Sequence, residues 1–183
     1  MKLTTERLIL RDVELSDAKS IRKYINNLNV SRYLLAVAFP YTKKDAEWWV
    51  NHCKEEQKKK PRENYEFGIV IKPGKEVVGG VGLSKVDLGQ GTADIGYWIG
   101  EDFWRKGYVS EAIIKLIEYA FNELELRRLK IPAFVENEGS NGLAKKLGFK
   151  FEGTLRKACK AKSTGKIHDE NIYGLLKEEW REK

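Results

Sequence analysis

The segment WIGEDFWRKGYVSEAIIKLIEYAF, residues 98–121, constrains the fold more than any other part of the chain. It begins as the end of an apolar strand, turns through a short polar stretch around Gly107 and continues as an amphipathic helix. The apolar positions of this helix recur at the i, i+3, i+4 spacing of one buried face. They are Ala112, Ile113, Leu116, Ile117, Ala120 and Phe121. A strand, a tight turn and a packed helix are therefore predicted here.

The predicted turn has the features of an anion site. The first backbone N–H groups of a helix have no partners inside the helix, and they lie at the positive end of its dipole. Such helix starts bind phosphate groups. Gly107 allows close approach of a ligand to the backbone, and Arg105 and Lys106 add positive charge. Shape alone leaves two interpretations open, a phosphate site and a simple chain reversal.

The turn resembles the acyl-coenzyme A signature of the GNAT acetyltransferase superfamily, Gln/Arg-x-x-Gly-x-Gly/Ala. Residues 104–109 fall on its six positions, with Trp104 in place of Gln/Arg and Val109 in place of the small final residue. Five further stretches resemble the branch that contains the ribosomal-protein N-terminal acetyltransferases. They are TTERLILR (4–11), FPYTKKDAEWW (39–49), ADIGYWIGEDFWRKGYVSEA (93–112), ENEGSNGLAKKLGFKFEGTLR (136–156) and HDENIYGLL (168–176).

This resemblance implies a mixed α/β (α+β) fold of the GNAT type in one domain over residues 1–183. The sheet is expected to be central, twisted and mostly antiparallel, with splayed central strands and flanking helices. Local patterns predict strands at 8–13, 65–71, 76–85, 93–99 and 128–135, and a hairpin of 149–156 with 166–175. Helices are predicted from a cap at Ser16 through Leu28, from the capping pair Thr42 and Asp45 to about residue 60, and over 140–147 before a left-handed Gly148.

Pro132 is unusual because it interrupts the apolar strand pattern of residues 128–135. Proline cannot donate to a strand ladder, so an edge strand or a bulge would explain it. The resemblance offers another explanation, in which this strand lies opposite the cofactor strand at a place where pairing between the two has already ended.

The resemblance implies acetyl-CoA as cosubstrate, and no metal site is evident in the sequence. The implied cofactor-binding residues are Trp98, Ile99, Trp104, Arg105, Lys106, Gly107, Tyr108, Val109, Ser110 and Asn137. The backbone amides of residues 105–109 would hold the pyrophosphate, and the backbone of Ile99 would bond the pantetheine arm. Ser140 is equally well explained as a simple helix N-cap.

Acetyl transfer to an amine needs a neutral amine, a stabilised oxyanion and a proton for the departing thiolate. Asp94 is the first candidate base, because it roughly matches a glutamate that serves as base in some GNAT enzymes; an exposed structural carboxylate is the alternative. Backbone N–H groups near Ile99 or Gly100 would stabilise the oxyanion. A tyrosine that many members use as general acid is replaced by Ala144, so Ser140, Tyr173 or a water would supply the proton.

The acceptor is expected to be a primary amine, most consistently the α-amine of a ribosomal or other protein N-terminus. An α-amine with a pKa of about 8 costs roughly 1 kcal/mol to deprotonate at pH 7, whereas a lysine side chain costs roughly 4.6 kcal/mol. The hydroxyls of Tyr33 and Tyr41 favour a wet pocket edge. Asp169 is interpreted as a pocket or structural carboxylate.

Composition agrees with a cytoplasmic enzyme, either monomeric or homodimeric. The chain has 183 residues, 34 basic against 27 acidic, and a net charge of +7 that suits a polyanionic cosubstrate. The start lacks the pattern of a signal peptide, no apolar stretch reaches membrane-spanning length, and the two cysteines form no zinc pattern. The basic runs lack interleaved aromatics, which disfavours nucleic acid. The alternatives are a small-molecule amine acetyltransferase acting on an antibiotic or polyamine, a non-catalytic CoA-binding regulator and an RNA-binding module.

Overall fold

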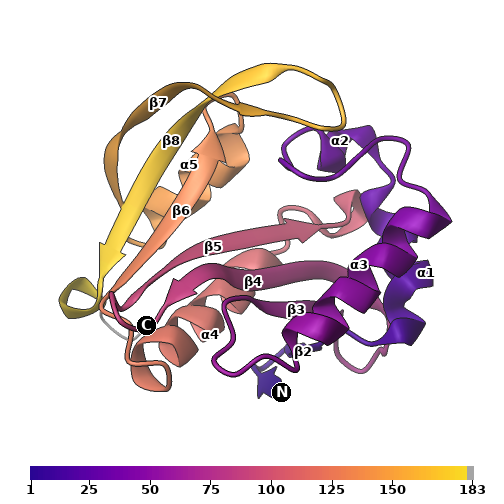
Figure 1. Cartoon of the computed structure of the whole chain (residues 1–183), viewed down its shortest axis with the longest axis horizontal. Coiled ribbons are helices and arrows are strands. Elements are labelled where there is room, and N and C mark those ends of the chain that lie inside the picture. The colour runs from indigo at the N-terminus through magenta and orange to yellow at the C-terminus, as the bar shows by residue number, and fades with distance from the viewer. Residues whose placement is uncertain (181–183) are drawn as a thin grey trace.

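One eight-stranded sheet forms the centre of the molecule in the computed structural model, which describes residues 1–180. In spatial order, the strands are β1 (Lys2–Thr4), β2 (Leu8–Asp12), β3 (Tyr65–Ile71), β4 (Val77–Asp87), β5 (Thr92–Ile99), β6 (Arg128–Phe134), β8 (Ile167–Leu176) and β7 (Lys150–Lys160) (Figure 1). Every neighbouring pair is antiparallel except β5 and β6, which are parallel. The expected mixed fold with a mostly antiparallel sheet is confirmed.

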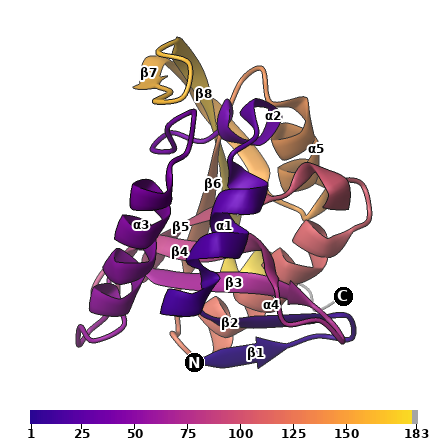
Figure 2. The same cartoon turned by 90° about the vertical axis from the view of Figure 1, so that its right-hand side faces the viewer.

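Helices cover both faces of this sheet (Figure 2). The α-helices are α1 (Ala18–Ile25), α2 (Leu28–Ser31), α3 (Lys43–Glu56), α4 (Tyr108–Asn122) and α5 (Glu138–Lys146), and the 3-10 turns are η1 (Leu15–Asp17), η2 (Glu101–Phe103) and η3 (Lys177–Glu179). One apolar cluster joins α4 and α5 to the sheet, and a second joins α1 and α3 to the opposite face. None of the helices within residues 1–180 combines the length and apolarity needed to cross a bilayer.

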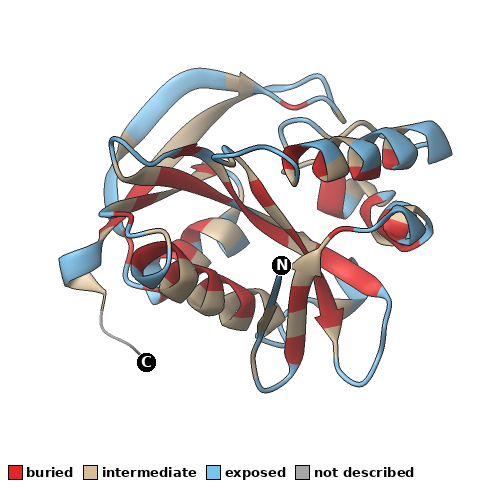
Figure 3. Ribbon diagram, turned by 60° about the horizontal axis from the view of Figure 1, so that its bottom comes forward, coloured by how far each residue is buried: buried red, intermediate tan, exposed pale blue. Residues whose placement is uncertain are grey.

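The periodicity of α4 correctly identified its buried face. All six apolar positions predicted from the sequence are at most 1 % exposed. Figure 3 shows buried residues along the sheet and on the sides of the helices that face it. The helix that follows the Gly107 turn is therefore fixed against β2, β4 and β5.

Two helix starts show how well local capping can be read from sequence. The capping box of Thr42 and Asp45 is confirmed, since each side chain accepts a hydrogen bond from the other residue's backbone N–H. The cap predicted at Ser16 is wrong, because the carboxylate of Asp17 accepts from the N–H of Glu14 at 2.8 Å and from Arg11 at 2.7 Å. Ser16 therefore lies inside η1, before α1 begins.

Two predicted helix ends are also corrected. The first helix stops at Ile25, and Leu28 begins the separate helix α2, which the side chain of Asn27 caps by accepting from the N–H of Asn29 at 2.8 Å. Helix α3 stops at Glu56 rather than near residue 60.

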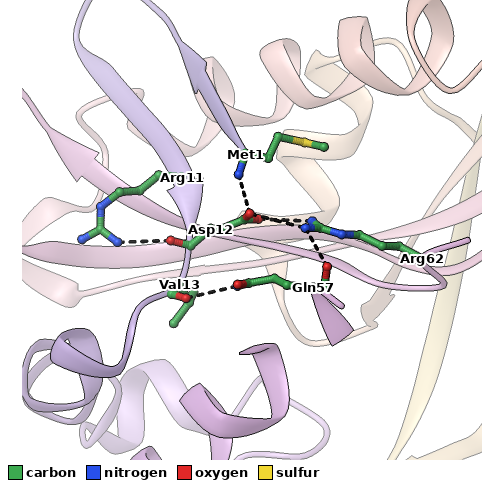
Figure 4. Close-up of polar contacts among 6 residues, drawn as sticks. All are labelled: Met1, Arg11, Asp12, Val13, Gln57 and Arg62. Carbon is green, nitrogen blue, oxygen red and sulfur yellow. Dashed lines mark hydrogen bonds and ion pairs between the residues drawn. The ribbon is translucent and has the colours of Figure 1, made fainter. Parts of the chain in front are cut away.

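The end of α3 is tied to the end of β2 by a cluster of polar contacts (Figure 4). The carboxylate of Asp12 bonds the N-terminal ammonium of Met1 and the guanidinium of Arg62, the latter at 3.3 Å. Arg62 also donates to the carbonyl of Gln57 at 3.1 Å, and the amide of Gln57 donates to the carbonyl of Val13 at 3.1 Å. These contacts end the helix and fix α3 over the sheet.

The two central strands part soon after they meet. β5 and β6 pair only where Thr92–Asp94 lies beside Arg128–Lys130, and they diverge beyond that point (Figure 1). The N–H of Arg128 donates toward β5, to Gly91, and that of Val135 donates to β8, so by strand alternation the nitrogen of Pro132 faces β5. Proline therefore stands where the next bond of the β5–β6 ladder would have formed, which confirms the second explanation for it.

The β7–β8 hairpin extends from the sheet and contacts the segment around α2 (Figure 1). The N–H of Lys162 donates to the carbonyl of Leu35 at 3.1 Å, and the hydroxyl of Ser163 donates to the carbonyl of Ser31 at 3.0 Å. The hairpin tip thus bridges the sheet half that holds β6–β8 to the half that holds α1–α3.

Candidate active site

The turn before α4 presents a row of unpaired backbone donors. Gly107 caps the helix with φ +82°, and Arg105 also has a positive φ of +59°. Within residues 1–180, none of the backbone N–H groups of residues 105–110 donates to a protein acceptor. Together with the helix dipole, this row forms a site for an anion such as a phosphate.

A brace from the β1–β2 turn holds the start of α4. The guanidinium of Arg7 donates to Glu111 at 2.7 Å and to the carbonyl of Lys106 at 3.1 Å, and it lies over the ring of Tyr108. The hydroxyl of Thr5 donates to the same carboxylate at 2.5 Å. Burial by itself would raise the pKa of Glu111, but the bonds from Thr5 and Arg7 outweigh it and hold that pKa below its ordinary value. The turn is therefore rigidly placed.

Other side chains of the turn bond within the turn itself. The indole N–H of Trp104 donates to the carbonyl of Ile99 at 2.9 Å, and the ammonium of Lys106 donates to the carbonyl of Asp102 at 2.8 Å. Arg105 is exposed, and Val109 and Ser110 are half-buried in the first turn of α4. The site at this turn therefore relies on backbone donors, with the basic side chains at its rim.

The edge of β5 that faces the opening has no strand partner. Gly100 donates to Val78 of β4, so by alternation the backbone of Trp98 also faces β4, whereas the backbones of Tyr97 and Ile99 face the opening. The N–H of Ile99 is therefore directed into the opening, while its carbonyl accepts from the indole of Trp104. The indole of Trp98 packs in the α1–α3 cluster, 2.5 Å from where a Cβ at Gly80 would lie, and the cofactor roles of Ile99 and Trp98 stay predictions.

A tyrosine that sequence reasoning missed lies at the opening. The hydroxyl of Tyr97 is 2.5 Å from the hydroxyl of Ser140, and burial raises the pKa of Tyr97 although the bond to Ser140 lowers it. Ser140 is not the helix cap. Asn137 caps α5, and its side-chain oxygen accepts from the N–H of Ser140 at 3.1 Å. Strand alternation could have directed Tyr97 to this face, but no local signal pairs it with Ser140.

Asp94 occupies the last paired position of β5 before the strands part. Its carboxylate is buried and forms ion pairs with Lys130 at 2.8 Å and with Lys85 at 3.2 Å. It is therefore not an exposed strand carboxylate. Its role as a base stays a prediction, and its ion pairs also join β4, β5 and β6 below the opening.

Two of the residues predicted to bind substrate are engaged elsewhere. Tyr41 is buried in the α1–α3 cluster rather than at a wet edge, and burial raises its pKa to about 12. The carboxylate of Asp169 accepts from the N–H of Lys157 at 2.7 Å, which supports a bulge in β7. Tyr33 is half-buried in the segment after α2, beside the hairpin tip.

Position 144 and its surroundings leave few candidate acids. Ala144 is fully buried in the α4–α5 cluster, and the hydroxyl of Tyr173 is committed to Asn141 at 2.8 Å. Of the side chains predicted to supply the proton, Ser140 lies at the opening, where its hydroxyl bonds that of Tyr97. Among residues 1–180, no group of three or more His, Cys, Asp or Glu side chains is arranged to hold a metal ion.

The fold and the turn define an acetyltransferase of the GNAT class, and the chain belongs to that family: the model of the acetyltransferase (GNAT) domain matches residues 7–150. It is 36% identical to the N-acetyltransferase p20 of Bacillus licheniformis over 97% of each chain. It is also 36% identical to the ribosomal-protein-serine acetyltransferase of Escherichia coli over 83 residues, which cover 45% of this chain and 46% of that one. A microcin self-immunity acetyltransferase, solved in complex with acetyl-CoA and AMP, superposes with a TM-score of 0.82 at 28% identity, covering 94% of this chain and 93% of that one.

Proposed function

We propose that this enzyme transfers the acetyl group of acetyl-CoA to the N-terminal α-amine of a protein or peptide. The observation that carries the proposal is the row of unpaired N–H groups at residues 105–110, which the short turn η2 joins to the unpaired edge of β5. A phosphate-binding turn next to an open strand edge suits a ligand that has a pyrophosphate at one part and a chain of amides at another.

The chain has groups that fit both the pyrophosphate and the pantetheine amides of acetyl-CoA. The turn supplies several N–H donors for the pyrophosphate, and the rim residues Arg105 and Lys106 add charge. The N–H of Ile99 and the backbone of Tyr97 are directed into the opening, where amide groups of the pantetheine arm would replace the missing strand. The side-chain nitrogen of Asn137 donates to no protein acceptor within residues 1–180 and lies at the start of α5 beside the same opening.

The choice of an α-amine rests on the pKa of such amines and on similarity to a relative. An α-amine needs only roughly 1 kcal/mol to become neutral at pH 7, so modest help from a base suffices. A relative in Escherichia coli is named a ribosomal-protein-serine acetyltransferase, and the similarity extends over 83 residues of this chain. A polycationic amine fits less well with a protein whose net charge is +7.

The proposal is tested by thiol release from acetyl-CoA with three acceptors. The first is a peptide whose only free amine is N-terminal, the second is the same peptide with a blocked N-terminus and one free lysine, and the third is a small polyamine. We expect the highest catalytic efficiency with the first acceptor. Faster reaction with the second or third would overturn the N-terminal assignment, and thiol release with none of them would favour a non-catalytic CoA-binding protein.

A further inference from the structure

A single carboxylate interrupts the apolar face that β3 turns toward α1 and α3. The neighbours of Glu66 on this strand, Tyr65 and Phe67, point to the α4 face and are buried in its cluster. Glu66 itself points to the other face, where its carboxylate lies over β4: a Cβ at Gly82 would be 2.6 Å from Oε2 of Glu66. The glycine at position 82 is therefore what allows this carboxylate to lie across the next strand.

The strand beyond Gly82 is uncovered on this face at Gly96. Gly82 pairs with Gly96 of β5, and Gly96 is exposed, with no atom within 4 Å of where its Cβ would be. Neighbouring strands lie about 4.8 Å apart, so Glu66 spans the first strand and stops roughly one strand spacing short of Gly96. The next residue, Tyr97, already faces the opening between β5 and β6.

Glu66 and Trp98 line one small pocket on this face, together with Trp49 and Gly80. Neither the carboxylate of Glu66 nor the indole N–H of Trp98 has a protein hydrogen-bond partner within residues 1–180. The pocket has a volume of about 10 Å³, which is room for about one water molecule beside the unpaired carboxylate. A larger surface hollow, lined by Arg11, Glu14, Glu76 and others, shares no residue with this pocket.

The charged and titratable groups around Glu66 are few. Helix α3 presents the thiol of Cys53 and the carboxylate of Glu56, with His52 beside the latter, and β4 and β5 present Lys85 and Asp94 further along the same face. Burial and, to a smaller extent, the charge of Glu56 together raise the pKa of Glu66 to about 7. Within residues 1–180, no cation is paired with the carboxylate to oppose these effects.

We propose that Glu66 takes the proton of the acceptor's ammonium through one water. The resulting neutral amine forms the new C–N bond with the acetyl carbonyl carbon, the C–S bond breaks with its electron pair going to sulfur, and the second proton lost by the nitrogen goes to the thiolate. Glu66 then releases its proton to solvent. The proposal rests on the amine acetylation proposed above and adds a residue of β3 to the site.

Asp94 is the competing carboxylate, and its surroundings differ from those of Glu66. Two lysines neutralise Asp94, whereas Glu66 faces none within hydrogen-bond distance. Glu66 is therefore the one of these two carboxylates that can accept a proton without breaking an ion pair.

The test compares Glu66→Gln, Asp94→Asn and, as a matched control, Glu63→Gln, whose side chain is exposed in the loop before β3. For each variant, kcat/KM is measured between pH 5.5 and 9.5 with whichever amine of the acceptor panel the parent enzyme acetylates best. Calorimetry on each variant gives the affinity for acetyl-CoA, and also the affinity of the enzyme–CoA complex for the acceptor. Because the best acceptor is used whatever its class, this test of Glu66 does not depend on whether the enzyme prefers an N-terminal amine.

We expect Glu66→Gln to lower kcat/KM near pH 7 by about 100-fold or more, and to lose the rise in kcat/KM through pH 7 that the parent and Glu63→Gln show. Its affinity for acetyl-CoA is expected to equal that of the parent, while the acceptor binds its CoA complex more weakly. The role of Glu66 would be overturned if Glu66→Gln lowered kcat/KM less than tenfold, or if it lowered kcat/KM further but kept the rise through pH 7. If Glu66→Gln kept that rise and Asp94→Asn lost it, the base would be Asp94.

Discussion

The hydroxyl oxygens of Tyr97 and Ser140 lie 2.5 Å apart, so one hydrogen bond joins β5 to the helix that follows β6. These are the two strands that part to form the opening, and there β5 has no ladder partner on its β6 side. The bond therefore places a half-buried hydroxyl pair at the proposed path of the pantetheine arm. Because Ala144 removes the usual tyrosine, this pair is the best candidate to protonate the leaving thiolate.

Tyr97→Phe and Ser140→Ala are each expected to lower kcat by about 100-fold with little change in acetyl-CoA affinity. The double variant should be no worse than either single variant, because the two hydroxyls act as a unit. Burial raises the pKa of Tyr97, so its proton is retained and the parent should show no alkaline loss of activity below about pH 10. Steady-state kinetics over pH provides the measurement, with Tyr119→Phe on α4 as the control; full turnover in Tyr97→Phe would remove the pair from the mechanism.

Gly107→Val is expected to weaken acetyl-CoA binding by about tenfold or more, which corresponds to 1.4 kcal/mol. Gly107 has φ +82°, and a Cβ there would lie 3.4 Å from the guanidinium of Arg7. Left-handed backbone costs a side chain about 1–2 kcal/mol, so the variant should also be less stable. Titration calorimetry measures the affinity.

Gly148→Val separates the loss of acetyl-CoA affinity expected for Gly107→Val from its loss of stability. Gly148 has φ +95° after α5, and nothing lies within 4 Å of its Cβ position. It should show the same loss of stability with acetyl-CoA affinity unchanged. Equal affinity in folded Gly107→Val and Gly148→Val would show that the turn does not hold the cosubstrate.

Glu111→Gln is expected to destabilise the protein by about 1–3 kcal/mol at pH 7, because it weakens the hydrogen bonds from Arg7 and Thr5 to a charged group. The folded pKa of Glu111 lies below its ordinary value, so this stability is present above the unfolded pKa and is lost as pH falls through the folded pKa. The difference between parent and variant should therefore shrink below about pH 4. Urea denaturation at several pH values measures it; a difference that does not change with pH would contradict the ion pair's contribution.

Glu66→Gln is expected to gain stability relative to the parent as pH rises. The folded pKa of about 7 lies above the ordinary value of 4.5, so the folded state binds more protons between these values and the parent loses stability across that window. The full difference corresponds to about 3 kcal/mol. Denaturation of both proteins at pH 4 and pH 8 checks the sign, and a parent that is relatively more stable at pH 8 would contradict an unpaired Glu66.

The features that sequence predicted correctly are local ones. Gly107, the helix periodicity after it, and the Thr42–Asp45 capping box each depend on residues within a few positions. Pro132 was also informative, because a missing N–H is tolerated only where a strand lacks a partner on that side. Such patterns predicted the turn and the strands of the sheet other than β1, whereas the parting of β5 and β6 was expected from the family resemblance.

The features that sequence missed depend on contacts distant in the chain. Tyr97 and Ser140 are 43 residues apart, and Arg7 and Glu111 are 104 apart. Strand alternation predicts which face a side chain takes, but not what lies opposite it. Glu66 did leave a signal, since it is the one carboxylate in the otherwise apolar run of residues 65–71. The predicted cap at Ser16 failed because the neighbouring Asp17 accepts both from Glu14 and from Arg11.

The most direct test of the central claim uses one peptide that carries both a free N-terminal α-amine and a free lysine. The enzyme and acetyl-CoA are incubated with it at pH 7, and tandem mass spectrometry locates the acetyl group. The account predicts acetylation at the α-amine, with acetylation abolished when that amine is blocked. An acetyl group found first on the lysine, or no acetylated peptide from folded enzyme that binds acetyl-CoA, would contradict it.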